Sequence, residues 1–209
     1  MIEPTYGVLL AGGLSRRMGG GDKGLSAIDG RSMLGRVIAT LAPQCTGLLL
    51  NANGDPGRFE SFGLPIVADD VPGFAGPLAG ILAGLEWLAQ KAPAAVWAVS
   101  VAADTPFIPT DLVARLHAAR SAAEARLACA ASAGRIHPVV GLWPVALRHD
   151  LRAFLIDEGQ RRTGSFAARY RLAEAAWPDT PYDPFFNANA PQDLDEAEAI
   201  ARRLAGPGW

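Results

Sequence analysis

The residues best suited to chemistry lie in one glycine-rich loop near the N-terminus, residues 10–24. Its glycines have no Cβ, so backbone N–H groups can come close to a ligand. Consecutive amides in such a loop form a concave site for an anion, and Arg16, Arg17 and Lys23 add positive charge to it. A surface turn would need neither so many glycines nor these cations. The loop therefore predicts a site that binds a polyphosphate.

This loop differs from two common phosphate-binding loops. A P-loop has Gly-Lys followed by Ser or Thr, whereas Lys23 lies between Asp22 and Gly24. The dinucleotide-binding fingerprint opens a helix directly, but Gly12 and Gly13 lead into the cationic stretch. The loop belongs to neither class.

Polar side chains follow three apolar segments that are typical of buried strands. They are Asn51 after residues 48–50, Asp69 after residues 66–68, and Asp104 shortly after residues 96–101. A carboxylate at a strand end suits Mg²⁺, which takes one or two carboxylates together with phosphate oxygens of a substrate. Asp and Asn at strand ends also form turns and helix caps, and this alternative stays open for Asn51 and Asp69. Asp104 is the predicted Mg²⁺ ligand.

The elements that position these residues alternate between strand and helix through the first 120 residues or so. Leu34, Val37, Ile38 and Leu41 recur at the spacing of an amphipathic helix, and residues 78–88 carry a second apolar stripe. Strands that alternate with helices predict an α/β fold with a mostly parallel sheet covered on both faces. Ligands bind such sheets outside the carboxyl ends of the strands. The glycine-rich loop and the three polar residues should therefore share one edge.

The second half of the chain is less regular. We expect strands at residues 127–130 and 139–143, and helices at residues 147–155 and 191–204. Asn187 and Asn189 precede the last helix, where one amide can act as a cap and two suggest a further role. His137, next to Pro138, is either part of a structural pair or a site residue. With no repeat and no clear linker, residues 1–209 are predicted to form a single domain.

Composition excludes several classes of function. A formal net charge of −2 gives no reason to expect a nucleic acid or a membrane surface as partner.

Cys45 and Cys129 lack a metal-ligand spacing and are expected to be reduced, buried thiols. His117 and His149 lie on expected helices and are predicted to be solvated. The N-terminus lacks the features of a signal peptide, and no apolar stretch is long enough to span a bilayer, so a cytoplasmic protein is expected.

Four motifs, in this order, resemble the molybdenum cofactor guanylyltransferase family. They are Leu-Ala-Gly-Gly at 10–13 continuing to Asp-Lys-Gly at 22–24, Gly-Pro-Leu-Ala-Gly at 76–80, Asp-Thr-Pro at 104–106, and Asn-Ala-Asn-Ala-Pro at 187–191. The resemblance implies a Rossmann-like, three-layer αβα nucleotidyltransferase fold. It also implies transfer of GMP from GTP to molybdenum-bound molybdopterin, with Mg²⁺ as cofactor and pyrophosphate as product. Transient contact with molybdopterin-insertion proteins or molybdoenzymes would follow.

The same resemblance implies a role for individual residues. GTP would contact Leu10, Ala11, Gly12, Gly13, Lys23, Asn51, Asp69 and Asp104. Arg17, Lys23 and Asp104 would be the catalytic groups, with Mg²⁺ on Asp104. The acceptor would contact Asn187, Asn189 and Arg161, with Arg162 as a further candidate. Residues 1–120 would form the GTP-binding half and residues 121–209 the acceptor half.

Two alternatives remain at this level. One is a related nucleotidyltransferase that uses CTP or a sugar-phosphate acceptor. Relatives that use CTP replace a glycine of the first loop by alanine, whereas Gly12 and Gly13 match the guanine branch. The other is a non-catalytic module that binds GTP or the finished cofactor. It would bind its ligand without releasing pyrophosphate.

Overall fold

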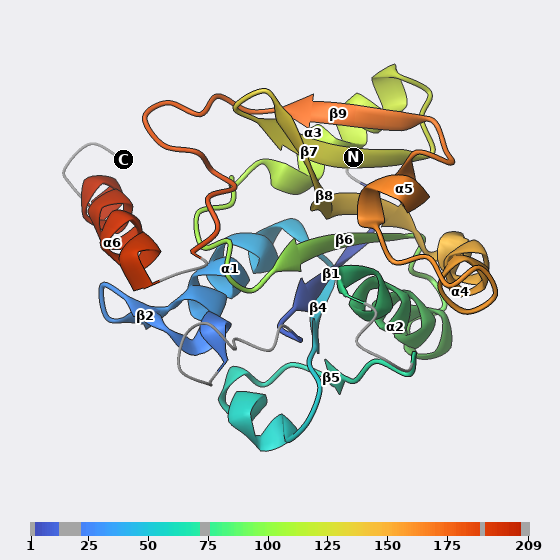
Figure 1. Cartoon of the computed structure of the whole chain (residues 1–209), viewed down its shortest axis with the longest axis horizontal. Coiled ribbons are helices and arrows are strands. Elements are labelled where there is room, and N and C mark those ends of the chain that lie inside the picture. The colour runs from blue at the N-terminus through green and yellow to red at the C-terminus, as the bar shows by residue number, and fades with distance from the viewer. Residues whose placement is uncertain (1–2, 13–21, 72–75, 189–190, 206–209) are drawn as a thin grey trace.

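The computed structural model describes residues 3–12, 22–71, 76–188 and 191–205. In these ranges a seven-stranded sheet has the order β5-β4-β1-β6-β8-β7-β9 (Figure 1). The strands are β1 Thr5–Leu10, β4 Gly47–Asn51, β5 Ile66–Val67, β6 Trp97–Ala102, β7 Leu127–Ser132, β8 Arg135–Pro144 and β9 Leu172–Ala176. Each neighbouring pair is parallel except the two that include β8. The prediction of a mostly parallel sheet is confirmed.

Helices cover both faces of this sheet. They are α1 Met33–Leu41, α2 Pro77–Lys91, α3 Leu112–Ala122, α4 Arg148–Ile156, α5 Thr163–Ala167 and α6 Pro191–Ala205. Short 3-10 turns are η1 Lys23–Leu25, η2 Ala42–Gln44, η3 Pro56–Phe62 and η4 Val145–Leu147, and β2 Ala27–Ile28 pairs with β3 Arg31–Ser32 in a separate hairpin. No helix within the described ranges is long and apolar enough to cross a membrane.

Apolar side chains point alternately to the two faces of the sheet and build a hydrophobic core on each face. Leu9 and Leu50 face α1 and α3, whereas their neighbours Val8 and Leu49 face α2, α4 and α5. Successive side chains of a strand point to opposite faces, so these apolar runs fill both sides of the sheet. The molecule therefore has three layers, helix, sheet and helix, as expected.

The parallel strands at one side of the sheet end at the same level. Leu10 pairs with Asn51 on one side and with Ala102 on the other, and Asn51 pairs with Val67. The last residues of β1, β4, β5 and β6 are thus neighbours along one edge. Asn51, Asp69 and Asp104 therefore leave the sheet at the shared edge that the sequence predicts.

The hairpin of β7 and β8 extends past this edge. Gly141 of β8 pairs with Ser100, two residues before β6 ends, and β8 runs against β6, so the start of β8 extends beyond the end of β6. His137 then pairs with Ala130, so residues 138–140 form a bulge in β8. The Ser100 hydroxyl donates to the Val139 carbonyl at 2.6 Å, which satisfies a polar group that the bulge frees from the ladder. Bulges of this kind re-aim side chains, often beside a site.

The last segment of the chain returns across the same edge. The backbone N–H of Ala188 donates to the Asp104 carbonyl at 3.3 Å. Ala188 also belongs to a small third core with Ile28, Met33 and Ile200. α6 follows and lies on the opposite side of the molecule from α4 (Figure 1). This return path brings a segment far along the chain to the ends of β1 and β6.

One prediction about side chains was wrong. His117 is buried, because α3 turns it toward the sheet. There its Nε2 lies 2.8 Å from the Thr5 hydroxyl and its ring meets the ring of Trp97 edge-on. His149 is exposed, as predicted. Burial raises the pKa of the Cys129 thiol to about 12, in line with the expected inert thiol.

Candidate active site

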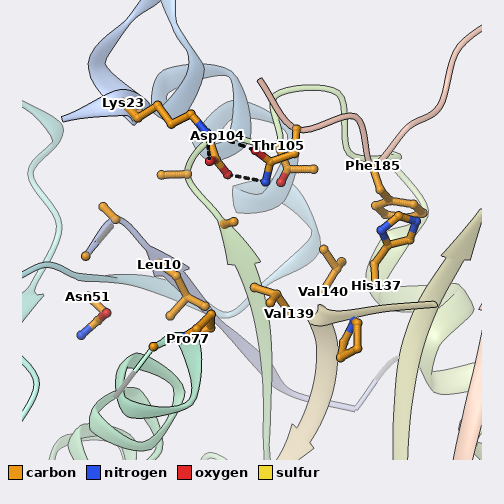
Figure 2. Close-up of a pocket in the computed structure, with 18 of the residues that line it drawn as sticks. Leu10, Lys23, Asn51, Pro77, Asp104, Thr105, His137, Val139, Val140 and Phe185 are labelled. Carbon is orange, nitrogen blue, oxygen red and sulfur yellow. Dashed lines mark hydrogen bonds and ion pairs between the residues drawn. The ribbon is translucent and has the colours of Figure 1, made fainter. Parts of the chain in front are cut away.

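A pocket of about 1030 Å³ opens at the carboxyl edge of the sheet. Its lining comes from the ends of β1, β4 and β6, the start of α2, the bulge of β8 and the segment before α6. Figure 2 shows Leu10, Asn51 and Pro77 at the lower left, His137 with Phe185 at the right, and Lys23 with Asp104 along the top. Polar groups therefore converge on one elongated pocket.

The centre of the pocket holds a cluster from three distant segments. Lys23 Nζ donates to Asp104 Oδ2 at 2.8 Å, and Asn187 Nδ2 donates to Asp104 Oδ1 at 2.8 Å. Lys23 Nζ also lies 3.4 Å from Asn187 Oδ1. The side chains of Lys23 and Asp104 are 14% and 19% exposed, so the pair is sheltered but open to a ligand. The structure thus brings together the cation, carboxylate and amide that the sequence singles out.

Close packing explains why Lys23 reaches Asp104. Lys23 begins η1, and Gly24 in the same turn is buried against the end of β6. A Cβ on Gly24 would lie 2.8 Å from the Cβ of Ala103, so a larger residue would push η1 away. On the other side, Arg58 of η3 forms an ion pair with Asp22. Both contacts fix the backbone on which Lys23 stands.

A second network occupies the end of the pocket at β4. Asp69 accepts hydrogen bonds from Asn51 Nδ2 and Asn53 Nδ2, each at 2.8 Å, and its backbone N–H donates to Asn53 Oδ1 at 2.8 Å. Gly80 of α2 packs against Asn51, because a Cβ there would lie 2.2 Å from Asn51 Oδ1. The carboxylate therefore has a fixed orientation and still carries free lone pairs. This network can accept hydrogen bonds from a nucleotide base.

The opposite end of the pocket contains a group that sequence reasoning found only in part. The Ser132 hydroxyl donates to Asp183 Oδ1 at 2.6 Å and lies 2.7 Å from His137 Nε2. The backbone N–H of Phe185 also donates to Asp183 Oδ1, at 2.9 Å. Burial opposes ionisation of Asp183, but the hydrogen bonds from Ser132 and Phe185, with smaller effects of His137 and of a hydrogen bond from Arg135, outweigh it and lower its pKa. Of this group, sequence reasoning singled out only His137, which lines the pocket, and missed Ser132 and Asp183.

Most predicted site residues described by the structure line the pocket. They are Leu10, Ala11, Gly12, Lys23, Asn51, Asp69, Asp104 and Asn187. Gly13, Arg17 and Asn189 lie outside the described residues. Arg161 and Arg162 lie between α4 and α5, are exposed, and are not part of the pocket lining.

The pocket has few groups for a metal ion. Among the residues described, no three His, Cys, Asp or Glu side chains form a cluster that could hold one. Asp104, beside Asn187, offers a carboxylate at the centre of the pocket. An ion there would need further oxygen ligands from a bound molecule.

Comparison with known protein sequences identifies one family. Residues 7–172 match the family described as MobA-like NTP transferase domain. A molybdenum cofactor guanylyltransferase from Bradyrhizobium sp. (strain ORS 278) is 62% identical over 195 residues, which cover 93% of this chain and 92% of the relative. A protein of the same name from Mesorhizobium japonicum is 48% identical over 207 residues, which cover 98% of this chain and 99% of the relative.

A solved structure shares the fold. Molybdopterin-guanine dinucleotide biosynthesis protein A from Archaeoglobus fulgidus has a TM-score of 0.73 and 21% identity, and the match covers 95% of this chain and 99% of that one. At this identity the likeness concerns the fold alone. The family match over residues 7–172 and the 62% identical relative show that the chain belongs to the MobA-like NTP transferase family.

Proposed function

We propose that the chain transfers GMP from GTP to molybdenum-bound molybdopterin and releases pyrophosphate. The observation that carries this proposal is the cluster of Lys23, Asp104 and Asn187 at the centre of an elongated pocket. A cation beside a carboxylate suits a triphosphate with its metal ion. The space on either side suits two ligands that meet there.

The nucleotide would lie toward β4. Guanine presents N1–H and an exocyclic amino group side by side, and the Asp69 carboxylate can accept hydrogen bonds from both. Cytosine lacks this adjacent pair of donors, so a fixed carboxylate favours GTP over CTP. Leu10, Ala11 and Gly12 line the pocket beside Asn51 and would contact the guanosine. Gly13 would continue the same loop.

Phosphate groups would lie at the centre, with Mg²⁺ as the proposed cofactor. Mg²⁺ takes one or two carboxylates and fills its shell with phosphate oxygens and water, so the single carboxylate of Asp104 beside Asn187 fits this ion. When bound, Mg²⁺ offsets negative charge on the triphosphate and on the departing pyrophosphate. Lys23 adds a positive charge at the same place, and Arg17 is proposed to add another.

The reaction needs positioning more than proton transfer. A terminal phosphate on the acceptor is largely ionised near neutral pH, so its oxygen can attack the α-phosphorus of GTP without a protein base. The new P–O bond forms as the bond between the α-phosphorus and the bridging oxygen breaks, and pyrophosphate leaves. Asn187 would orient the acceptor side, and holding both substrates in line supplies much of the acceleration.

The remaining assignments concern the acceptor half, about residues 121–209. Asn189 and Arg161 are proposed to contact molybdopterin, and Arg161 would have to do so from outside the present pocket lining. Transient contact with proteins that insert the cofactor, or with a molybdoenzyme, would hand on the product.

The test is a panel of nucleotides and acceptors, scored by release of pyrophosphate. GTP with molybdenum-bound molybdopterin and Mg²⁺ should give turnover that stops when the metal is chelated. CTP, or a sugar phosphate as acceptor, should give little. Preferred turnover with CTP or a sugar phosphate would favour the related transferase. Binding of GTP without pyrophosphate release would favour the non-catalytic module.

A further inference from the structure

The hairpin end of the pocket contains a histidine whose hydrogen bonding is defined by its neighbours. His137 lies on β8, just before the bulge, and lines the pocket. Its ring packs against the ring of Phe185 with centroids 5.0 Å apart and a tilt of 39°. One ring nitrogen, Nε2, lies 2.7 Å from the Ser132 hydroxyl.

The direction of these hydrogen bonds follows from counting protons. A serine hydroxyl has one hydrogen, and an ionised carboxylate only accepts. Ser132 therefore donates to Asp183, 2.6 Å away, and must accept from His137. Nε2 then carries the proton of the neutral ring, and Nδ1 keeps its lone pair. Within the described part of the chain, that lone pair meets no hydrogen-bond donor.

The state of the ring agrees with this arrangement. Burial lowers the pKa of His137, and Arg135 adds to the effect, while Asp183 opposes it. The ring is therefore neutral at pH 7, and Nδ1 is an acceptor rather than a donor. Phe185 and Val140 supply apolar surface at this end (Figure 2), beside the polar Arg135 and Asp183.

We infer that His137 binds the ring system of the acceptor, accepting a hydrogen bond from a ring N–H at Nδ1, with Ser132 and Asp183 as positioning residues. This inference rests on the proposed function, because it assigns this end of the pocket to the acceptor. A planar nitrogen heterocycle such as a pterin matches the site, because it offers N–H donors at its edge and flat apolar faces to the aromatic walls. A sugar phosphate offers no such face.

The test separates the two substrates. In His137→Phe the KM for molybdenum-bound molybdopterin should rise about tenfold, as expected for one lost hydrogen bond, while the KM for GTP stays unchanged. In His137→Asn the side-chain oxygen can replace Nδ1, so the KM for molybdenum-bound molybdopterin should lie between those of the wild-type chain and His137→Phe. Ser132→Ala should raise the same KM through loss of ring orientation. His149→Phe, at an exposed histidine of α4, is the matched control.

A second measurement needs no turnover. Nitrogen NMR of the histidine rings should show the Nε2–H tautomer for His137, with a change in Ser132→Ala. An Nδ1–H tautomer would overturn the inference, as would an unchanged acceptor KM in a folded His137→Phe variant while the wild-type chain turns over. If the wild-type chain itself releases no pyrophosphate, the proposed function fails and this inference with it.

Discussion

At the scale of single residues, the pocket depends on charges held in place by their neighbours. Lys23 and Asp104 are 81 positions apart in the chain, yet their charged atoms lie 2.8 Å apart. Neither side chain is needed to fill a hydrophobic core, so each can be changed with limited effect on folding. Substitutions there report on chemistry.

Lys23→Met should lower kcat/KM about 10²- to 10³-fold, because one positive charge on the phosphates is lost. Its thermal unfolding midpoint should stay close to that of the wild-type chain. Lys91→Met is a matched control, since Lys91 is exposed at the end of α2. A collapse of stability with normal activity per folded molecule would make Lys23 a structural residue.

Asp69→Asn should weaken discrimination between GTP and other nucleotides. The amide keeps the shape of the carboxylate but loses half of its acceptor capacity, so the KM for GTP should rise roughly tenfold. The exposed Asp179→Asn serves as control. An unchanged ratio of kcat/KM for GTP over CTP would remove Asp69 from base recognition.

At the scale of elements, α2 and the bulge of β8 position the two ends of the pocket. Gly80 of α2 lets the helix approach Asn51, and Ser100 of β6 holds the bulge through Val139. Neither residue is expected to contact a ligand directly. Gly80 supports the end of the pocket proposed for GTP and Ser100 supports the end proposed for the acceptor, so a change at each should alter the affinity for one substrate.

Gly80→Ala should raise the KM for GTP and destabilise the fold by roughly 1–3 kcal/mol through overpacking. Its Cβ would displace Asn51 and with it the Asp69 network. Gly164→Ala is the matched control, because Gly164 lies in α5 with nothing within 4 Å of an added Cβ. There alanine should stabilise the helix by about 0.5–1 kcal/mol, as chemical denaturation can measure.

Ser100→Ala should destabilise the chain by roughly 2–4 kcal/mol, since two polar groups lose their partner. These are the Val139 carbonyl and Trp143 Nε1, which donates to Ser100 Oγ at 2.8 Å. Urea denaturation gives the change. A difference within about 0.5 kcal/mol, which is typical of surface positions, would show that the bulge holds its shape without Ser100.

Some elements were predictable and others were not, for physical reasons. The strands ending at Leu10 and Asn51 are continuous apolar runs, so their burial is evident from the sequence. β9, in contrast, contains alanine, leucine and glutamate, which favour helices. It becomes a strand because pairing with β7 buries Ala173 and Ala175, a tertiary contact that local propensity cannot show.

The same distinction applies to the site. Lys23 lies in the glycine-rich loop that follows β1, and Asp104 lies just after β6, so both can be expected at the shared edge from the topology. Ser132 and Asp183 stand in no motif, and 51 positions separate them. Their meeting depends on the hairpin tip and the returning segment, which only the folded chain brings together.

At the scale of the whole molecule, the N-terminal strand is tied to α3 through His117. Burial lowers the pKa of His117, with Glu3 opposing and Arg120 adding to the effect. The unfolded chain therefore binds a proton, near pH 6.5, that the folded chain resists. Stability should be full above that pH and should decline as the pH falls below it.

This pH dependence can be measured as the free energy of unfolding in urea at pH 7.5 and pH 5.5. The wild-type chain should be less stable at the lower pH, and His117→Gln should lose less. The lowered pKa of His137 acts in the same direction. A double variant, His117→Gln with His137→Asn, should therefore lose the least stability between pH 7.5 and pH 5.5. An equal decline in all three would assign the effect to other groups.

The reversed direction of β8 has a consequence for how such a molecule can diversify. The four level strand ends form one wall, and a protruding hairpin, joined by the tight turn at Ala133 and Gly134, supplies the other. A longer or different hairpin would reshape one wall of the pocket and leave the opposite wall intact. Specificity for the nucleotide and specificity for the acceptor can therefore change independently during the evolution of proteins with this fold.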